Sequence, residues 1–345
     1  MNILKKDNQG VIDKKIIDNI RGLSIDIIDN AKSGHPGIAL GAAPIITTLY
    51  ANHLRFVQDK DQWMNRDRFI LSAGHGSALL YSTLYMAGFN LTLEDLKDFR
   101  KLSSITPGHP EYEVTSGVDM STGPLGQGIA SSVGMAIGEE YLSNYFGKNI
   151  INYYTYVLCG DGDLMEGVSY EACSLAGKLG LNKLIVLYDS NDVTLDGKLS
   201  TSSTENIKLR FEAMNWNYIL VGDGEDTNLI DDAINKAKVS DKPTIIEIKT
   251  TIGKFSKNQG TSKVHGSPLD EEDIKSIKEK LNLRDIPFSV SSEAVDAFRN
   301  LINERNNNLY EEWEKEVEKL DDLKKEELLS LMNHQEPLKI KDIYY

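Results

Sequence analysis

Five short apolar runs, separated by stretches of helical periodicity, constrain the fold of this chain more than any other feature. The runs are RFILS at 68–72, YTYVLC at 154–159, KLIVLYD at 183–189, NYILVG at 217–222 and TIIEIK at 244–249. Strands that alternate with helices form parallel sheets, because each helix carries the chain back across the sheet by a right-handed crossover. We therefore predict an α/β fold, a parallel sheet with helices on both faces, in which ligands bind beyond the carboxyl ends of the strands.

Two regions outside these runs are predicted to be helical. Apolar residues recur at steps of three and four over 12–31, which predicts an amphipathic helix that SGHPG ends, and a second helix is expected from Ile38 to about His53. After residue 270 the sequence becomes charged and helical, with an apolar stripe formed by Ala294, Phe298, Leu301, Trp313, Val317 and Leu320. We predict a main domain over 1–270 and a helical extension or connector over 271–345.

Composition narrows the kinds of partner. The 345 residues include 52 acidic and 38 basic side chains, for a formal net charge of -14. This excess of acid disfavours nucleic acid and anionic membranes as main partners and favours a small substrate or another protein. Neither a signal peptide nor a membrane span is evident, so we expect a cytoplasmic protein. Cys159 and Cys173 lie in apolar patterns and are expected to be buried free thiols.

The segment GDGDLMEG at 160–167 places acidic side chains in a turn that looks suited to a phosphate. It lacks the third glycine of a dinucleotide fingerprint and the lysine of a Walker loop. A divalent cation would reverse the local charge: Asp161 ends one strand and Asn191 the next, so their oxygens could hold Mg²⁺ or Ca²⁺ and, through it, a diphosphate. A helix opening near Leu164 would add N–H donors. A plain tight turn with a loop asparagine remains the alternative, and Asp163 has no role that the sequence reveals.

Four of the six histidines lie in glycine-flanked loops: His35 in SGHPG, His75 in AGHGS, His109 in PGHPE and His265 in VHGSP. A single histidine of this kind is usually a surface or structural residue. Four of them predict a site that contacts sugar hydroxyls and relays protons near neutral pH. His53 and His334 lack such a setting and are interpreted as surface residues.

With these segments in view, residues 10–270 resemble the N-terminal, diphosphate-binding domain of transketolases. The resemblance rests on AKSGHPGIALGAAPI, DRFILSAGHGSALLYSTLY, ITPGHPEY, TGPLGQGIASSVGMAIGE, CGDGDLMEGVSYEACSLAGKLGLNKLIVLYDSN and VHGSPL, in that order. The GDG, the 28 residues after it and the following Asn resemble the thiamine diphosphate signature. The helical tail resembles the connector that follows this domain. The resemblance implies the thiamine diphosphate-binding fold.

The resemblance also implies a reaction and its residues. The reaction is transfer of a two-carbon ketol unit from a ketose phosphate to an aldose phosphate, with thiamine diphosphate and Mg²⁺ or Ca²⁺ as cofactors. Asp161, Asn191 and the carbonyl of Val193 would bind the metal. Catalytic roles are implied for His35, His109 and His265. The implied cofactor-binding residues are His75, Gly123, Leu125, Asp161, Gly162, Glu166, Asn191 and His265. Glu166 resembles the acid that reaches across the dimer to the partner's catalytic glutamate, although an acid favoured by a helix dipole is an equal interpretation.

Transketolases resembling this sequence are about twice as long, and the remainder carries the pyrimidine-binding domain with the glutamate that activates the cofactor. We expect the pyrimidine-binding and C-terminal domains to be absent here, so that the chain is a split subunit, a fragment or a truncated form. The expected partners are sugar phosphates and a pyrimidine-binding half, a second copy of the chain, or both.

Two alternatives stay open. The first subunit of a 2-oxo acid dehydrogenase and deoxyxylulose-phosphate synthase share the acidic turn and the asparagine, but SGHPG and PGHPE favour transketolase. From another class, the chain could be a cofactor-binding or dimerisation module that has no turnover of its own.

Overall fold

The computed structural model describes residues 4–333, with side chains described from residue 14 onward. Its centre is a five-stranded sheet in the order β1-β2-β3-β5-β4, and all neighbouring strands are parallel. The strands are β1 (Arg68–Leu71), β2 (Thr155–Gly160), β3 (Leu184–Ser190), β4 (Asn217–Val221) and β5 (Thr244–Lys249). All five predicted strands and the predicted parallel sheet are therefore confirmed.

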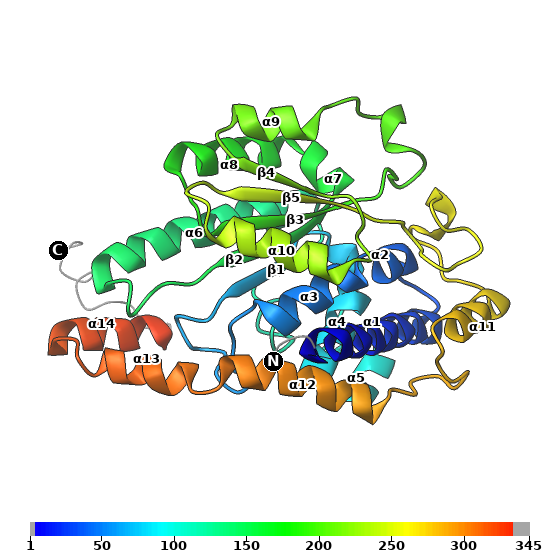
Figure 1. The fold of residues 1–345 in the computed structure, drawn as a ribbon, viewed down its shortest axis with the longest axis horizontal. Coiled ribbons are helices and arrows are strands. Elements are labelled where there is room, and N and C mark those ends of the chain that lie inside the picture. Colours follow the sequence, from blue (N-terminus) through cyan, green and yellow to red (C-terminus); the bar gives the residue numbers. More distant parts are fainter. Residues whose placement is uncertain (1–3, 334–345) are drawn as a thin grey trace.

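Helices cover both faces of the sheet, as predicted (Figure 1). One face packs against α6 (Gln127–Phe146), α8 (Gly167–Leu179) and α9 (Ile207–Ala213). The other packs against α3 (Ala43–Asn52), α4 (Ser77–Ala87) and α10 (Thr227–Lys238), with α1 (Leu4–Ala31), α2 (Pro36–Gly41) and α5 (Leu93–Lys97) beyond them. The strands serve both faces because successive side chains alternate: Val157 belongs to the first core and Leu158 to the second. Cys159 and Cys173 are buried free thiols of the first core, which confirms that prediction.

The helix predicted over 12–31 is confirmed within α1, but its amphipathic character is wrong, because residues 16–28 are all buried. The polar face is covered by helices that come much later in the sequence. Lys278 of α11 (Glu271–Lys280) forms an ion pair with Asp26 of α1 over 2.6 Å, and the Phe288 backbone N–H donates to the same carboxylate over 2.8 Å. The side chain of Ile12 lies outside the described residues.

The single helix predicted from Ile38 to His53 is wrong, since the chain forms α2 and α3 with a break at Ala42. Pro44 has no N–H to donate to the Leu40 carbonyl, and its ring would press against that oxygen. The Leu40 carbonyl instead accepts a hydrogen bond of 2.8 Å from Nε of the buried Arg21. The break turns α2 toward the carboxyl edge of the sheet.

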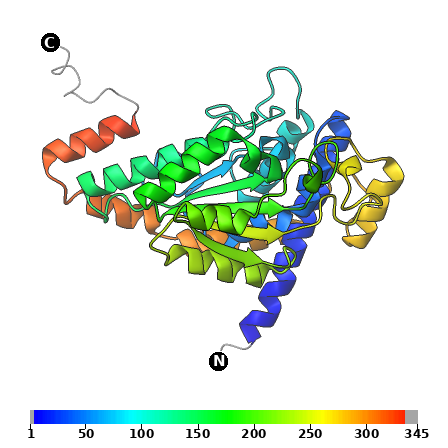
Figure 2. The same ribbon diagram turned by 90° about the horizontal axis from the view of Figure 1, so that it is seen from above.

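The predicted helical extension is confirmed as α11 (Glu271–Lys280), α12 (Ser292–Asn306), α13 (Leu309–Val317) and α14 (Asp322–Met332). Figures 1 and 2 show it running along the domain, with α11 and α14 at opposite ends. Ala294 and Phe298 join the main core, Trp313 and Val317 pack with Trp63, and Leu301 and Leu320 are partly buried. A domain boundary at residue 270 stays a prediction, and His334 lies outside the described residues.

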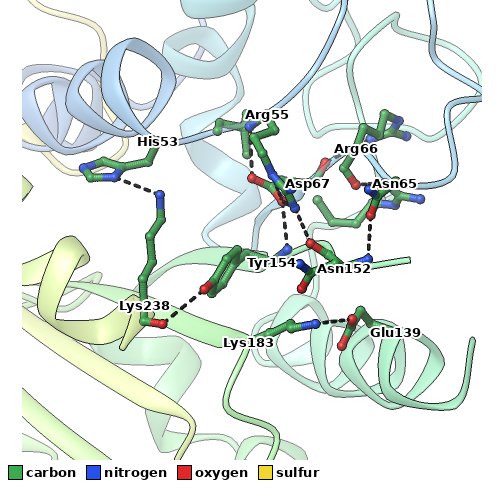
Figure 3. A network of polar contacts seen from close by, with 12 residues as sticks. His53, Arg55, Asn65, Arg66, Asp67, Glu139, Asn152, Tyr154, Lys183 and Lys238 are labelled. Atoms are coloured by element: carbon green, nitrogen blue, oxygen red, sulfur yellow. Dashed lines mark hydrogen bonds and ion pairs between the residues drawn. The ribbon is translucent and has the colours of Figure 1, made fainter. Parts of the chain in front are cut away.

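Ion pairs fix the amino ends of the strands (Figure 3). Asp67, just before β1, is 2% exposed; its carboxylate accepts from the Tyr154 backbone N–H over 2.8 Å and from the Arg55 backbone N–H over 3.0 Å, and pairs with the Arg55 guanidinium at 2.8 Å. Before β3, Lys183 reaches Glu139 of α6 over 2.5 Å. Each of these buried carboxylates is thus paired with a basic side chain. We call the pairs Asp67–Arg55 and Glu139–Lys183, with the residues linked to them by the contacts drawn in Figure 3, the amino-edge network.

His53 belongs to the same network, so its interpretation as a surface residue is wrong. It is 3% exposed, with Nδ1 3.1 Å from Nζ of Lys238 and Nε2 3.0 Å from the Asp231 carboxylate. It lies at the end of α3, where α10 covers it, and no sequence pattern places those two helices side by side.

None of the helices in the described part of the chain combines the length and apolar composition needed to cross a membrane.

Candidate active site

The loops at the carboxyl ends of the strands hold most of the predicted site residues. Each of four strands runs into a short helical turn or is followed by one; these turns are η1 (Gly74–Gly76), α7 (Asp161–Met165), η2 (Leu199–Thr201) and η3 (Ser262–Val264). His75 lies in η1, Asp161 opens α7 directly after β2, and Asn191 follows β3. Because β1, β2 and β3 are parallel neighbours, these residues share one edge of the sheet. The helix expected near Leu164 is in fact two helices, since α7 begins at Asp161 and α8 at Gly167.

Three of the four predicted histidines meet at this edge. Ring centroids are 5.0 Å apart for His35 and His75, 5.2 Å for His75 and His265, and 5.7 Å for His35 and His265. The three rings come from separate loops, before α2, after β1 and after β5. Nδ1 of His35 and Nδ1 of His265 are buried without a hydrogen-bond partner in the described residues, so both can bind a ligand atom.

His109 is exposed and lies beside the GPLGQG loop. Gly123 of that loop has φ +154°, and a Cβ there would stand 3.3 Å from the His109 ring. A Cβ on Gly74, next to His75, would stand 2.8 Å from the Gly123 nitrogen. Only glycine permits this approach of two loops and this backbone conformation. The glycines therefore bring the His75 and His109 loops together.

The environment keeps these imidazoles neutral near pH 7. Burial, with smaller contributions from His265, Arg100 and His109, lowers the pKa of His35 to about 4. Burial and the neighbouring rings lower the pKa of His75 well below its usual range, and burial lowers the pKa of His265 and of His109. A neutral imidazole has one N–H donor and one acceptor nitrogen, which suits it to sugar hydroxyls and to proton transfer.

Asp161 is buried without a cationic partner. It is 5% exposed; the Tyr188 hydroxyl donates to Oδ1, and Oδ2 has no hydrogen-bond partner within residues 4–333. Burial, together with repulsion from the Asp189 and Asp192 carboxylates, raises the pKa of Asp161 to about 7. A buried carboxylate oxygen left without a partner costs free energy, and a bound cation would remove that cost.

Asn191 lies beside this carboxylate. Its backbone N–H lowers the pKa of Asp161, while its side-chain Nδ2 donates to Asp189 over 3.0 Å and its Oδ1 accepts from the Val193 N–H over 3.1 Å. Val193 is 8% exposed and forms a bridge with Lys198, which closes the loop after β3. The predicted ligands Asp161, Asn191 and Val193 thus come from two adjacent strand ends.

Leu125, Gly162 and Glu166 lie next to one another at the outer side of the site. A Cβ on Gly162 would stand 3.1 Å from Cδ1 of Leu125, and one on Gly126 would stand 2.8 Å from Cβ of Glu166. Leu125 is 40% exposed, and Glu166 is exposed at the junction of α7 and α8. Their exposed positions leave them free to contact a cofactor or another chain.

Sequence reasoning missed three residues of this site. Asp163 is fully buried and accepts hydrogen bonds from the Ser72 hydroxyl, the Gly126 N–H and the Gly160 N–H over 2.7, 2.9 and 3.0 Å. It lies three residues after Gly160 and accepts the Gly160 N–H, but glycine has no side chain to complete a capping box, so the sequence carried no clear signal for it. Tyr188 and Arg100 had no signal either. Arg100 donates to the Ser33 hydroxyl over 2.9 Å and lies close enough to His35 and His109 to lower their pKa values.

Comparison with known proteins places this site in a family. Residues 12–337 match the family model described as "Transketolase, thiamine diphosphate binding domain". The chain belongs to the transketolase family. It is 52% identical to the transketolase of Staphylococcus aureus (strain MRSA252) over 89% of this chain and 47% of that protein, and 53% identical to that of Bacillus subtilis (strain 168) over 88% and 46%.

Solved transketolases share the fold. The transketolase of Pichia stipitis in complex with sedoheptulose 7-phosphate superposes with a TM-score of 0.90 and 41% identity, over 94% of this chain and 49% of that one. The chain spans about half the length of the transketolases it matches. These matches favour transketolase over the other two thiamine enzymes considered above.

The residues at the strand ends fit the cofactor of this domain of the transketolase family. The unpartnered Oδ2 of Asp161 offers a ligand for a cation, and the unpartnered Nδ1 atoms of His35 and His265 offer contacts to phosphate or hydroxyl oxygens. Among the described residues, no three His, Cys, Asp or Glu side chains are grouped to hold a metal ion. The predicted set contains one carboxylate, one amide and one carbonyl, so the metal site stays a prediction.

Proposed function

We propose that this chain is the diphosphate-binding half of a transketolase, which transfers a two-carbon ketol unit from a ketose phosphate to an aldose phosphate when a pyrimidine-binding half completes it. One observation carries the proposal. The buried Asp161 carboxylate has no cationic partner among the described residues and shares a strand edge with three clustered, neutral histidines, in a chain of the transketolase family.

In this proposal Asp161 Oδ2, Asn191 Oδ1 and the Val193 carbonyl hold Mg²⁺ or Ca²⁺, since oxygen donors of this kind suit hard divalent cations. Asn191 Oδ1 would exchange its bond to the Val193 N–H for the cation. His75, Gly162 and His265 contact the diphosphate, and Gly123 and Leu125 lie along the rings of the cofactor. When bound, thiamine diphosphate supplies the electron sink for the carbanion that forms as the ketose carbon–carbon bond breaks.

His35, His109 and His265 bind the hydroxyls and carbonyl of the substrate and move protons to and from them. Support comes from the low pKa values of the three rings, which leave each with an acceptor nitrogen at neutral pH. Support for sugar phosphates as substrates comes from the related Pichia stipitis structure, which is a complex with sedoheptulose 7-phosphate.

The partner belongs to the same proposal. The outer faces of α6 and α8 expose the apolar side chains of Ile137, Tyr141, Tyr145 and Leu179 around a groove of about 460 Å³, and α8 also exposes Leu175. Figure 2 shows these two helices side by side on the surface of the domain. Apolar patches of this kind favour a protein interface. We propose that a pyrimidine-binding half or a second copy of the chain packs here, with Glu166 near the contact, and that the assembly acts in the cytoplasm.

A reconstitution experiment tests the function. The purified chain is incubated with thiamine diphosphate, MgCl₂, xylulose 5-phosphate and ribose 5-phosphate, with and without a chain that comprises the C-terminal half of the Bacillus subtilis transketolase. Activity that appears only with the second half supports the proposal.

The outcome also decides a second candidate, a cofactor-binding module without turnover, which the match to a thiamine diphosphate binding domain also supports. Calorimetric binding of thiamine diphosphate with Mg²⁺, but no turnover in either mixture, would identify such a module. If no thiamine diphosphate binds in either mixture at any Mg²⁺ concentration, both candidates are wrong.

A further inference from the structure

Asp163 is the one acidic residue of the GDGDLMEG segment for which the sequence suggests no role, and its surroundings in the structure are unusual. The side chain is completely buried, yet no lysine, arginine or histidine pairs with it in the part of the chain that the structure describes. Burial raises the pKa of its carboxyl, and three hydrogen bonds lower it. Burying a carboxylate without a basic partner costs folding free energy, so its presence here points to a specific role.

The three donors to Asp163 come from three separate loops. Oδ1 accepts from the Ser72 hydroxyl over 2.7 Å and from the Gly126 backbone N–H over 2.9 Å, and Oδ2 accepts from the Gly160 backbone N–H over 3.0 Å. Ser72 begins the loop that holds His75. Gly126 ends the stretch that holds Gly123 and Leu125, and Gly160 precedes Asp161.

The packing around these donors leaves little freedom. Gly126 has φ +80°, a conformation that aims its N–H at Asp163, and a Cβ there would stand 2.8 Å from both Glu166 Cβ and Ser169 Oγ. Two residues on, a Cβ on Gly128 would stand 2.5 Å from the Cα of Ser72. The start of α6 thus rests directly on the end of β1, and Asp163 joins both to the acidic turn.

We propose that Asp163 is a positioning residue that locks the three cofactor-facing loops into one rigid frame. The inference rests on the proposed function, because it assigns these loops to thiamine diphosphate. A carboxylate meets the need because it has two acceptor oxygens and no donor hydrogens. An asparagine has a single acceptor oxygen, and its NH₂ group would face a backbone N–H, so at least one loop would be released.

The substitution Asp163→Asn tests this inference by affinity. Affinity for thiamine diphosphate at saturating MgCl₂ should fall at least about tenfold, as expected for the loss of a hydrogen bond to a charged group. The matched control is Asp67→Asn in the amino-edge network. Asp67 is 2% exposed and also accepts two backbone N–H bonds, but its charge is matched by Arg55 and it lies at the opposite, amino end of β1. This control should lose thermal stability and keep wild-type affinity.

Amide hydrogen exchange gives a readout that does not depend on the cofactor. In Asp163→Asn, exchange should quicken by about tenfold or more over 72–76, 123–128 and 160–165, while α10 keeps its protection. Ser72→Ala, which removes a single donor, should show a smaller change of the same kind and remains available if Asp163→Asn does not fold.

The two proposals fail in different ways. If the wild-type chain binds no thiamine diphosphate, either alone or with the C-terminal half, the proposed function is wrong, and the exchange data still decide the role of Asp163. If Asp163→Asn folds and retains both wild-type affinity and wild-type exchange in the three loops, Asp163 is not a positioning residue. If exchange quickens uniformly over the whole chain, its role is general stability, which also overturns the inference.

Discussion

The two edges of the sheet treat buried carboxylates in opposite ways. At the amino edge, Asp67 has Arg55 as its basic partner and Glu139 has Lys183 (Figure 3). The nearby buried Asp119 has Arg66. At the carboxyl edge, Asp161, Asp163 and Asp189 are buried to a similar degree. None of these three forms an ion pair among residues 4–333; hydroxyl, amide and backbone N–H groups hold them instead.

This difference separates structural charge from functional charge. A paired carboxylate recovers part of its desolvation cost from its partner, so the amino edge holds the fold together without help from a ligand. Burial raises the pKa of Asp161 to about 7 and that of Asp189 to about 6, and neither carboxylate has a basic partner among the described residues to offset the cost of burial. Acidic residues with raised pKa values are found preferentially at functional sites, which agrees with the proposed cation site at Asp161.

The largest expected effect comes from Asp161→Asn. Removal of the only carboxylate of the proposed metal site should abolish Mg²⁺-dependent binding of thiamine diphosphate, with affinity at least about a hundredfold weaker by calorimetry. The ligand-free variant should also be more stable than wild type at pH 7.5, by roughly 1–3 kcal/mol in urea unfolding, because no charge is then buried at this site. Asp67→Asn is the isosteric control, with lower stability and unchanged affinity. Unchanged affinity in Asp161→Asn would end the metal assignment.

A second substitution tests the amino edge. Lys183→Met leaves the Glu139 carboxylate, 1% exposed, without its partner at 2.5 Å, and should lower the free energy of unfolding by about 3 kcal/mol. The double variant Glu139→Gln/Lys183→Met removes the charge as well and should recover most of the loss. Thiamine diphosphate affinity should stay at the wild-type value in both. A double variant as unstable as the single one would show that packing, and not charge, sets the cost.

The two edges can also be compared through one histidine from each, by measuring kcat. In the reconstituted enzyme, His109→Ala should lower kcat about a hundredfold and leave cofactor affinity nearly unchanged, because a lost proton-transfer group affects the chemical step. His53→Ala at the amino edge should lower the melting temperature and leave kcat unchanged. Equal kcat for His109→Ala and wild type would remove His109 from the active site.

Much of the fold was predictable because its signals are local. Each strand is a continuous apolar run bounded by polar residues, and a parallel sheet buried on both faces makes such runs unavoidable. The helix break at Ala42 and the burial of α1 on all sides were not predictable in this way. The first depends on how Pro44 and the Leu40 carbonyl interact with Arg21, and the second on helices that lie more than 240 residues later in the chain.

The residues of the candidate site also fall into those that local motifs identify and those that only tertiary contacts reveal. Glycine-flanked histidines and the GDG turn are visible as short motifs, so His35, His75, His265 and Asp161 could be named from the sequence. Tyr188 could not, since a tyrosine inside an apolar strand is indistinguishable from core until its hydroxyl is seen on Asp161. His53 was misread for the opposite reason, because its burial comes from the packing of α3 on α10. Local motifs identify residues, whereas their partners require the three-dimensional structure.

The smallest expected effect is a pH dependence with two opposite signs at one edge. The folded-state pKa of His35, about 4, lies below its unfolded value near 6.5, so its contribution to stability is complete above pH 6.5 and is lost as the pH falls toward 4. The folded-state pKa of Asp161, about 7, lies above its unfolded value, so its contribution is present below about pH 4 and is lost as the pH rises through 7. The ligand-free wild-type chain should therefore show a flat profile in which the two trends offset each other.

Variants separate these trends. As the pH falls from 7.5 to 5, the free energy of unfolding of His35→Gln should rise by about 1–2 kcal/mol relative to that of wild type, because glutamine takes up no proton in either state. For Asp161→Asn, the free energy of unfolding relative to wild type should rise in the opposite direction, as the pH increases from 5 to 7.5. The double variant Glu139→Gln/Lys183→Met, at the amino edge, leaves both groups in place and buries no unpaired carboxylate, so it should keep the flat profile over this range. Urea midpoints at pH 5, 6 and 7.5 measure all three, and parallel profiles for His35→Gln and wild type would mean that His35 is not buried as a neutral ring.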